Sequence, residues 1–242
     1  MANIKVSIIN ASTVLSDIQV QAMVPALQTQ VHRDFAPAWG IDADLTFVRR
    51  GGTPAPNSWW LSVLNNTDIA NALGYHDRTN QGKPIAKVFA KTAIDHGRSV
   101  SVTASHELLE MLADPEINLT VFNQTTPIAG RLYAYEVCDP SPADSQGYVI
   151  NGVRVSNFVF PAWFEPFNIG AQYDYRHLIS SPLHFAPSGY IGVFDVTSGS
   201  GWHLIFSENI KEEDKEVPVI GTRRERRARG KDGWVNSVLV RT

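Results

Sequence analysis

The segment 104–115 holds the most chemically informative spacing in the sequence. It reads Ala-Ser-His-Glu-Leu-Leu-Glu-Met-Leu-Ala-Asp-Pro, so His106 and Glu110 are four residues apart and Glu107 lies between them. In a helix, side chains four residues apart lie on one face, so this imidazole and this carboxylate would point the same way. Both groups bind zinc, and Glu107 could accept a proton from a metal-bound water. The spacing therefore predicts a metal site with a general base beside it.

A helix over 101–114 must position these groups. At about 100° per residue, the polar residues of the segment form one stripe, and the leucines form an apolar face on the other side. Asp114 precedes Pro115, and a residue before proline is pushed out of the helical region, which ends the helix. An ordinary amphipathic helix with a solvated polar face fits the same pattern. The helix alone does not separate the two interpretations.

A metal site on this helix needs a third protein ligand. Glu136 and Asp139 are the leading candidates, and Glu136 is the first choice. On an extended chain Glu136 and Cys138 share a face and Asp139 points the other way, although a turn before Pro140 would reverse this. Asp114, one turn further along the helix, is a third possibility. The alternative is that Glu136 and Asp139 are surface or capping acids.

Other side chains allow both a functional and a structural interpretation. Cys138 could be a soft metal ligand, but a small buried apolar role is favoured. His76 and Asp77 could reach the site from a loop, although a surface histidine is the commoner outcome. Tyr133 and Tyr135 could donate to an oxyanion, and core packing is the default for both.

The first half of the sequence is expected to alternate strands and helices. Apolar alternation predicts strands, and apolar residues at steps of three and four predict a helix that begins near Ser16. Lys87 and Lys91 lie on one side of the last strand, which is typical of a sheet edge. In chain order we expect a strand at 4–8, a helix from 16 that ends at Pro37 and Gly40, strands at 45–47 and 59–64, a polar loop at 65–84 and an edge strand at 85–92.

Two segments together resemble a zincin-like group of proteins from phages and bacteria. They read Val-Thr-Ala-Ser-His-Glu-Leu-Leu-Glu-Met-Leu-Ala-Asp-Pro at 102–115 and Tyr-Ala-Tyr-Glu-Val-Cys-Asp-Pro at 133–140, within a resemblance that covers 58–165. The resemblance implies a zincin-like N-terminal half, in which an edge strand lies over a metal-bearing helix and binds extended peptide through backbone hydrogen bonds. It also implies zinc as cofactor and a peptidase activity.

The motif departs from the H-E-x-x-H helix of zinc peptidases at Glu110, which stands where the second histidine normally lies. A carboxylate also binds zinc, but it makes the charge of the site more negative. A more negative ligand set makes a bound water less acidic. Weaker hydrolysis is therefore expected even if the metal binds.

The expected fold class is α+β, with a zincin-like N-terminal half and a β-rich C-terminal half. In the second half, 148–155 reads as a hairpin with an Asn-Gly turn, 188–196 contains a strand, and the aromatic residues of 158–167 favour a core. We expect a zincin-like α/β subdomain at 1–125 with the metal helix 101–114, a β-rich subdomain at 126–215 that completes the site, and a basic extension at 216–242.

Composition excludes several classes of protein. Of 242 residues, 43% are hydrophobic and 19% charged, which is typical of a globular chain with a core. The sequence has no apolar run of about 18 residues that could cross a membrane. Cys138 is the single cysteine, so no internal disulfide is possible, and a reducing compartment is expected. No signal-peptide pattern is present at the start, so synthesis and retention in the cytoplasm are expected.

The last residues concentrate positive charge. Positions 221–242 contain seven Lys or Arg and two acids, a balance of +5, so the remainder carries −3 − 5 = −8. An acidic protein surface, most simply an adjacent copy, is the expected partner, which implies a homo-oligomer or a larger assembly. Nucleic acid is less favoured, because aromatic residues for base stacking are nearly absent. The residues expected to bind the partner are Arg223, Arg224, Arg226, Arg227 and Arg229.

Two functions from different classes follow. The first is a zinc-dependent peptidase in which His106, Glu110 and Glu136 or Asp139 hold zinc and Glu107 activates water. The second is a catalytically inactive zincin-like protein that serves in an assembly, such as a phage particle, and docks through its basic tail. The intact Glu107 favours the first, and the altered ligand set with the basic tail favours the second.

Overall fold

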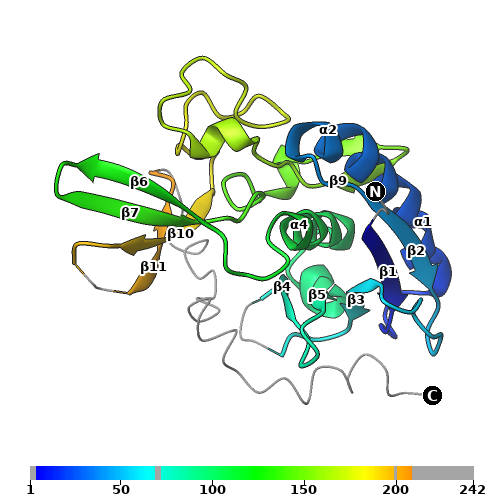
Figure 1. Ribbon diagram of the computed structural model, residues 1–242. Helices are drawn as coiled ribbons and strands as arrows, with labels where there is room; N and C mark the ends of the chain where they lie inside the picture. Colours follow the sequence, from blue (N-terminus) through cyan, green and yellow to red (C-terminus); the bar gives the residue numbers. More distant parts are fainter. Residues whose placement is uncertain (1–3, 69–71, 199–200, 209–242) are drawn as a thin grey trace.

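A computed structural model of the chain describes residues 4–68, 72–198 and 201–208. The described residues form an α+β structure in which helix α4 lies at the centre (Figure 1). Helices α1, α2, α3 and α4 span Asp17–Thr29, Ala36–Trp39, Ala90–Asp95 and Val100–Ala113. The strands are β1 (Ile4–Asn10), β2 (Ala43–Val48), β3 (Trp59–Leu64), β4 (Gly74–Arg78), β5 (Pro84–Phe89), β6 (Thr120–Thr126), β7 (Ala129–Ala134), β8 (Tyr148–Ile150), β9 (Val153–Val155), β10 (Tyr190–Asp195) and β11 (Trp202–Phe206).

The main sheet is mixed and has the order β2-β1-β3-β5-β4. The first four strands of this order run parallel, and β4 pairs antiparallel with β5 at the edge. The prediction of an edge strand at 85–92 is therefore wrong, because β5 has a strand on each side. The strand at this end of the sheet is β4, which lies in the segment 65–84 that was expected to be a loop.

Lys87 also corrects the sequence analysis. Its side chain is buried, and its Nζ lies 2.5 Å from Asp68 Oδ2 and 5.4 Å from the centre of the Tyr75 ring. The buried lysine therefore lies on an inner strand, pairs with the exposed carboxylate of Asp68, and does not protect a sheet edge. Lys91 belongs to α3, where it pairs with Asp95 one turn away.

The first helical run begins as predicted at Ser16, which forms a capping box with Gln19. Pro25 lies within α1, and the run ends at Gly40, whose φ of 68° is left-handed. Between α1 and α2 the backbone adopts a π-helix, η1 (Gln30–Phe35). Gln30 and Asp34 are buried within η1. Ser105 on α4 donates to Gln30, which fixes this helical run against α4.

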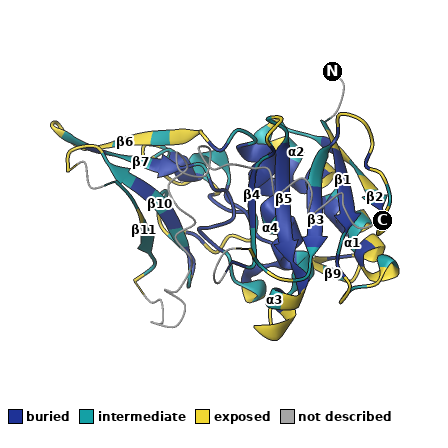
Figure 2. Ribbon diagram, turned by 90° about the horizontal axis from the view of Figure 1, so that it is seen from below, coloured by how far each residue is buried: buried dark blue, intermediate teal, exposed yellow. Residues whose placement is uncertain are grey.

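Helix α4 is buried on nearly all sides. Ser99 caps its N-terminus through the N–H of Val102, and Asp114 ends it before Pro115. Its leucines enter the core, and Glu107 and Glu110 on the polar face are buried as well. Figure 2 shows α4 and the adjoining strands β4 and β5 as the most buried part of the molecule. An amphipathic helix with a solvated polar face is therefore the wrong interpretation.

The second half is β-rich, as expected. Strands β11, β10, β7 and β6 form an antiparallel sheet in that order, and β8 and β9 form the predicted hairpin. Asn151 and Gly152 have φ values of 49° and 81°, as its turn requires. The β6–β7 hairpin was not predicted. The segment 158–167 is mainly core, since Phe158, Trp163 and Phe164 are buried.

One hydrophobic core joins the two halves. It contains buried residues of the main sheet, of α4 and of β10, for example Val6, Leu108 and Val193. Two further helical turns, η2 (Asp144–Gln146) and η3 (Pro161–Phe164), lie in the connections of the second half. Among the described residues, no helix has both the length and the hydropathy needed to cross a membrane.

Candidate metal centre

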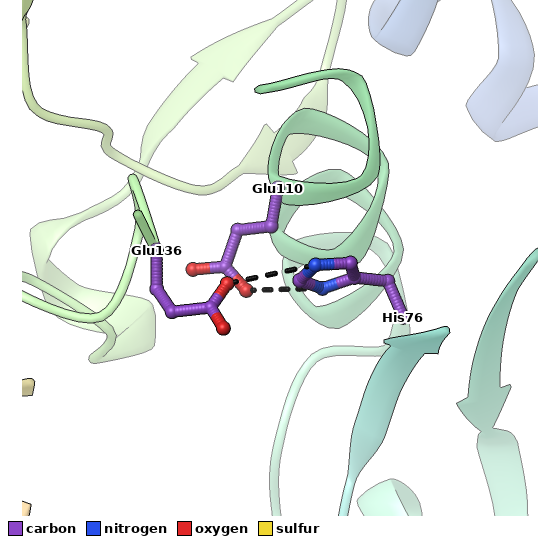
Figure 3. A group of neighbouring side chains, drawn as sticks. All are labelled: His76, Glu110 and Glu136. Carbon is purple, nitrogen blue, oxygen red and sulfur yellow. Dashed lines mark ion pairs between the residues drawn. The ribbon is translucent and has the colours of Figure 1, made fainter. Parts of the chain in front are cut away.

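Three segments bring ionisable side chains to the polar face of α4. They are β4, α4 itself and the chain that follows β7 (Figure 3). Within the described residues, two groups of three side chains have donor atoms within 4.8 Å of one another. The groups are His106, Glu110 and Asp139, and His76, Glu110 and Glu136.

The first group contains the motif histidine. His106 Nε2 lies 3.2 Å from Glu110 Oε2 and 3.3 Å from Asp139 Oδ1. The side chains of His106 and Asp139 are 12% exposed, and that of Glu110 is 5% exposed. Ligands at roughly 2.0–2.1 Å from a tetrahedral zinc ion lie about 3.3–3.4 Å from one another. The two distances from His106 therefore suit ligands of a zinc ion, and they are also the distances of hydrogen bonds from the imidazole to both carboxylates.

The second group is built around His76, whose two ring nitrogens face the carboxylates of Glu110 and Glu136 (Figure 3). Its Nδ1 is 3.7 Å from Glu110 Oε2, and its Nε2 is 3.6 Å from Glu136 Oε2. His76 is 2% exposed. The expectation of a histidine in a surface loop is therefore wrong, since His76 belongs to β4 and faces α4. Asp77, the next residue, points to the opposite face of the sheet because side chains alternate along a strand.

A turn brings both candidate third ligands to the same side. Ser141 donates its backbone N–H to Cys138 O at 3.0 Å, so the chain bends after Glu136 and Asp139 faces the site. The Cys138 N–H donates to Glu110 Oε1 at 3.1 Å, which joins this turn to α4. Glu136 is thus near His76, and Asp139 is near His106. The structure therefore leaves two candidates for the third ligand, Glu136 and Asp139.

Glu107 lies beside both groups. Its Oε2 is 3.9 Å from His76 Nδ1. Gly74 on β4 packs so closely that a Cβ there would come within 2.8 Å of Glu107 Cγ and Oε1. The missing side chain at Gly74 is therefore what lets Glu107 occupy its position between β4 and α4.

Burial and mutual repulsion shift the pKa values of this cluster. Burial raises the pKa of Glu110 to about 7, and neighbouring carboxylates add to the effect. Burial also raises the pKa of Glu107 well above the usual carboxyl range and raises that of Asp139. Burial alone would lower the pKa of His106, but the carboxylates of Glu110 and Asp139 raise it well above 6.5. In the metal-free chain the cluster therefore holds protons near neutral pH.

The remaining candidates have structural positions. Asp114 accepts the N–H groups of Asn118 and Leu119, and it belongs to neither group of three. Cys138 is a buried free cysteine within the core, as favoured. Tyr133 is buried in the core, and Tyr135 makes an edge contact with the Trp39 ring and a tilted contact with the Phe164 ring. The five arginines expected to bind a partner, Arg223, Arg224, Arg226, Arg227 and Arg229, lie outside the described residues.

The sequence suggested no role for Tyr190, and it suggested His76 only as a loop residue that could reach the site. Tyr190 on β10 donates its hydroxyl to Asp139, and burial raises the pKa of that hydroxyl well above 10. No local spacing links Tyr190 to the helix motif. A strand at His76 could have been predicted from the turn that follows it. In this tight turn Gly82, with φ 78°, donates its N–H to Thr79 O. That turn between two strands would have placed His76 in a hairpin.

Comparisons of this chain with protein-family models, with curated proteins and with solved structures found no match. The functional conclusion therefore rests on the geometry of the site itself.

Proposed function

We propose that this chain is a zincin-like, zinc-dependent hydrolase of peptides. The observation that carries the proposal is the group of His106, Glu110 and Asp139, buried on one side of α4 with donor atoms 3.2 and 3.3 Å apart. Glu107, one residue from the motif histidine, supplies a carboxylate beside the group. In this proposal Asp139 is the third zinc ligand, and Glu136 is not a ligand of this ion.

The donor set suits zinc. One imidazole nitrogen and two carboxylate oxygens leave a fourth position for water or substrate, as catalytic zinc sites require. The Tyr190 hydroxyl donates to Asp139 and the Cys138 N–H donates to Glu110, so both carboxylate ligands have an orienting partner. A buried excess of carboxylates also favours a cation, because an unpaired buried charge is costly.

Each residue has a distinct role in the proposed reaction. A bound zinc ion would supply an electrophile for water and for a peptide carbonyl. Glu107 would take the proton of the attacking water and pass it to the leaving amine. Its raised pKa places it nearer neutral pH, where proton transfer in both directions is efficient.

The edge strand supports a peptide as substrate. Among the described residues β4 has one strand neighbour, β5, and on its inner face Gly74 packs against Glu107 and His76 faces Glu110. An extended peptide that paired with β4 on the side away from β5, through backbone hydrogen bonds, would bring a carbonyl to the site.

Metal content tests the zinc assignment. Protein purified without chelators should contain stoichiometric zinc by elemental analysis, and His106→Ala should lose the ion bound at this group. The matched control is His32→Ala, since the His32 side chain is 41% exposed and lies on another element. The absence of stoichiometric metal in the wild-type chain would refute the zinc assignment.

A catalytically inactive, metal-bound assembly protein is the second candidate. The observation that favours it is burial, because the most exposed side chains of the first group are only 12% exposed. A site closed to this degree suits a structural ion better than turnover of a long peptide. Full zinc occupancy without cleavage of a mixed peptide library would select this candidate over the peptidase.

A further inference from the structure

The second group of donor atoms could hold a cation of its own. His76, Glu110 and Glu136 are all buried, and they come from three separate elements. Two of them, His76 and Glu136, play no part in the zinc group proposed above. Glu110 belongs to both groups, so the two positions are adjacent.

The distances around His76 are too long for hydrogen bonds. Its ring nitrogens lie 3.6 Å from Glu136 Oε2 and 3.7 Å from Glu110 Oε2, whereas N–H···O bonds are about 2.7–3.2 Å. The two distances start from different ring nitrogens, and one ion binds only one of them. One donor atom from each of His76, Glu110 and Glu136 lies within 4.8 Å of the other two, which leaves room for an ion among them. His76 Nδ1 is the nitrogen that faces Glu110, and it also faces Glu107 at 3.9 Å.

Glu110 is oriented to serve two ions. Its Oε1 accepts the N–H of Cys138, which fixes the rotation of the carboxylate. Its Oε2 is then the atom nearest both imidazoles, 3.2 Å from His106 Nε2 and 3.7 Å from His76 Nδ1. An oxygen held between two imidazoles is placed to bridge two cations.

Charge balance points the same way. Four carboxylates surround the two imidazoles and carry a formal charge of −4 when ionised: Glu107, Glu110, Glu136 and Asp139. Histidine ligands bind metals in their neutral form. One divalent ion would leave −2 in a buried cluster unless protons are retained, and two divalent ions neutralise it.

We propose that a second divalent transition-metal cation binds between His76, Glu110 and Glu136, and that Glu110 bridges it to the ion at His106. The inference rests on the proposed function, because the ion at His106 is the first member of the pair. Two ions about 3.5–4 Å apart can stabilise both the attacking and the leaving group of a hydrolysis. Glu136 is then a ligand of the second ion only.

Zinc stoichiometry is the primary test. Metal-free protein is titrated with Zn²⁺ by calorimetry, and zinc is counted by elemental analysis after dialysis. We expect two ions per wild-type chain and one in both His76→Ala and Glu136→Gln. The exposed-histidine control His32→Ala should keep two. Glu136→Gln preserves side-chain size, so it decides the test if His76→Ala fails to fold by circular dichroism.

The outcomes separate this inference from the proposed function. One ion in the wild type that is lost in His106→Ala and kept in His76→Ala would overturn the second position alone. One ion that is lost in His76→Ala and kept in His106→Ala would overturn the pair and the proposed zinc group. Two ions that remain in both second-position variants would place the extra ion elsewhere.

Electron paramagnetic resonance tests independently whether Glu110 bridges the two ions. The chain loaded with two equivalents of Mn²⁺ should give an exchange-coupled electron paramagnetic resonance spectrum, because the ions share Glu110. Glu136→Gln should restore a single-ion spectrum. A wild-type spectrum that is the sum of two isolated ions would contradict the bridge.

Discussion

At the scale of single residues, Glu110 makes a contact that a histidine at its position could not make. Its Oε1 accepts the Cys138 N–H and thereby holds the turn that carries Asp139, while its Oε2 faces His106. An imidazole ligand that used one nitrogen for metal could only donate with the other, and it could not accept this N–H. In the proposed site, a carboxylate at position 110 therefore ties the turn of Asp139 to the helix and also makes the charge of the site more negative.

Glu107→Gln should separate metal binding from chemistry. The amide keeps the size of the side chain but cannot accept a proton from water, so peptide cleavage should fall by about 10²-fold or more. Zinc content should stay at the wild-type level, because Glu107 belongs to neither group of three. Parallel elemental analysis and cleavage kinetics measure both quantities. Equal cleavage by the two proteins would remove Glu107 from the mechanism.

The affinity for zinc should rise with pH. Burial raises the pKa of Glu110 to about 7, and the pKa of His106 is raised above 6.5, so protons occupy these ligand atoms at lower pH. Zinc must displace those protons, which weakens binding below neutral pH and ceases to matter above the raised pKa values. Calorimetric titration between about pH 5.5 and about pH 8.5 checks this. A constant affinity across that range would contradict it.

The stability of the metal-free chain should change with pH in the opposite direction. A carboxyl whose pKa is raised by folding stabilises the folded state below its unfolded pKa of 4.5, and this contribution is lost as the pH rises through about 7. Thermal melts without metal should therefore show a loss of stability from this cluster between those values, and added zinc should offset it near neutral pH.

At the scale of elements, the sequence predicted those whose signals are local. The helix at 101–114 follows from its periodicity, the start of α1 from its Ser16 cap, and the β8–β9 hairpin from Asn151-Gly152. Strand β4 escaped prediction because Gly74 and the charged residues after it have low strand propensity. Its position is determined by tertiary contacts. Gly74 packs against Glu107, and Lys87 Nζ lies over the ring of Tyr75.

The convergence of the ligands was predictable only in part. The shared face of His106 and Glu110 is a property of the helix itself. The approach of Asp139 depends on the turn closed by Ser141, and that of His76 on strand pairing with β5. Both are long-range arrangements that spacing along the chain does not specify.

Gly74→Ala should disturb the contact between β4 and α4. The new Cβ would meet Glu107 Cγ at 2.8 Å and the backbone oxygen of Lys87 at 2.9 Å, and backbone cannot move aside easily. Overpacking of this kind costs about 1–3 kcal/mol. Gly192→Ala on β10 is the matched control, since its nearest contact would be 3.4 Å. Urea denaturation measures both, and equal stability of the two variants would contradict the proposed packing.

At the scale of the whole molecule, charge is divided between the body and the C-terminal residues. Positions 221–242 carry +5 and the remainder −8. We expect truncation after Val219 to leave the described part of the chain folded and to reduce self-association, because the removed residues carry the excess positive charge. Light scattering after size exclusion measures the latter, and association that is charge-driven should also weaken with salt. A truncated chain that associates as the full chain does would refute this docking role.

The edge position of β4 has a kinetic consequence. Within the described residues β4 has hydrogen bonds to a single strand, whereas α4 is enclosed on nearly all sides. Strands bonded on one side open locally at lower free energy than the interior of a sheet. Opening of β4 would move Gly74 and His76 away from α4 together and expose the carboxylates behind them. We therefore expect the local opening of this strand to limit the rate at which a bound ion exchanges with solvent. The amide hydrogens of β4 should exchange more slowly once the ion is bound.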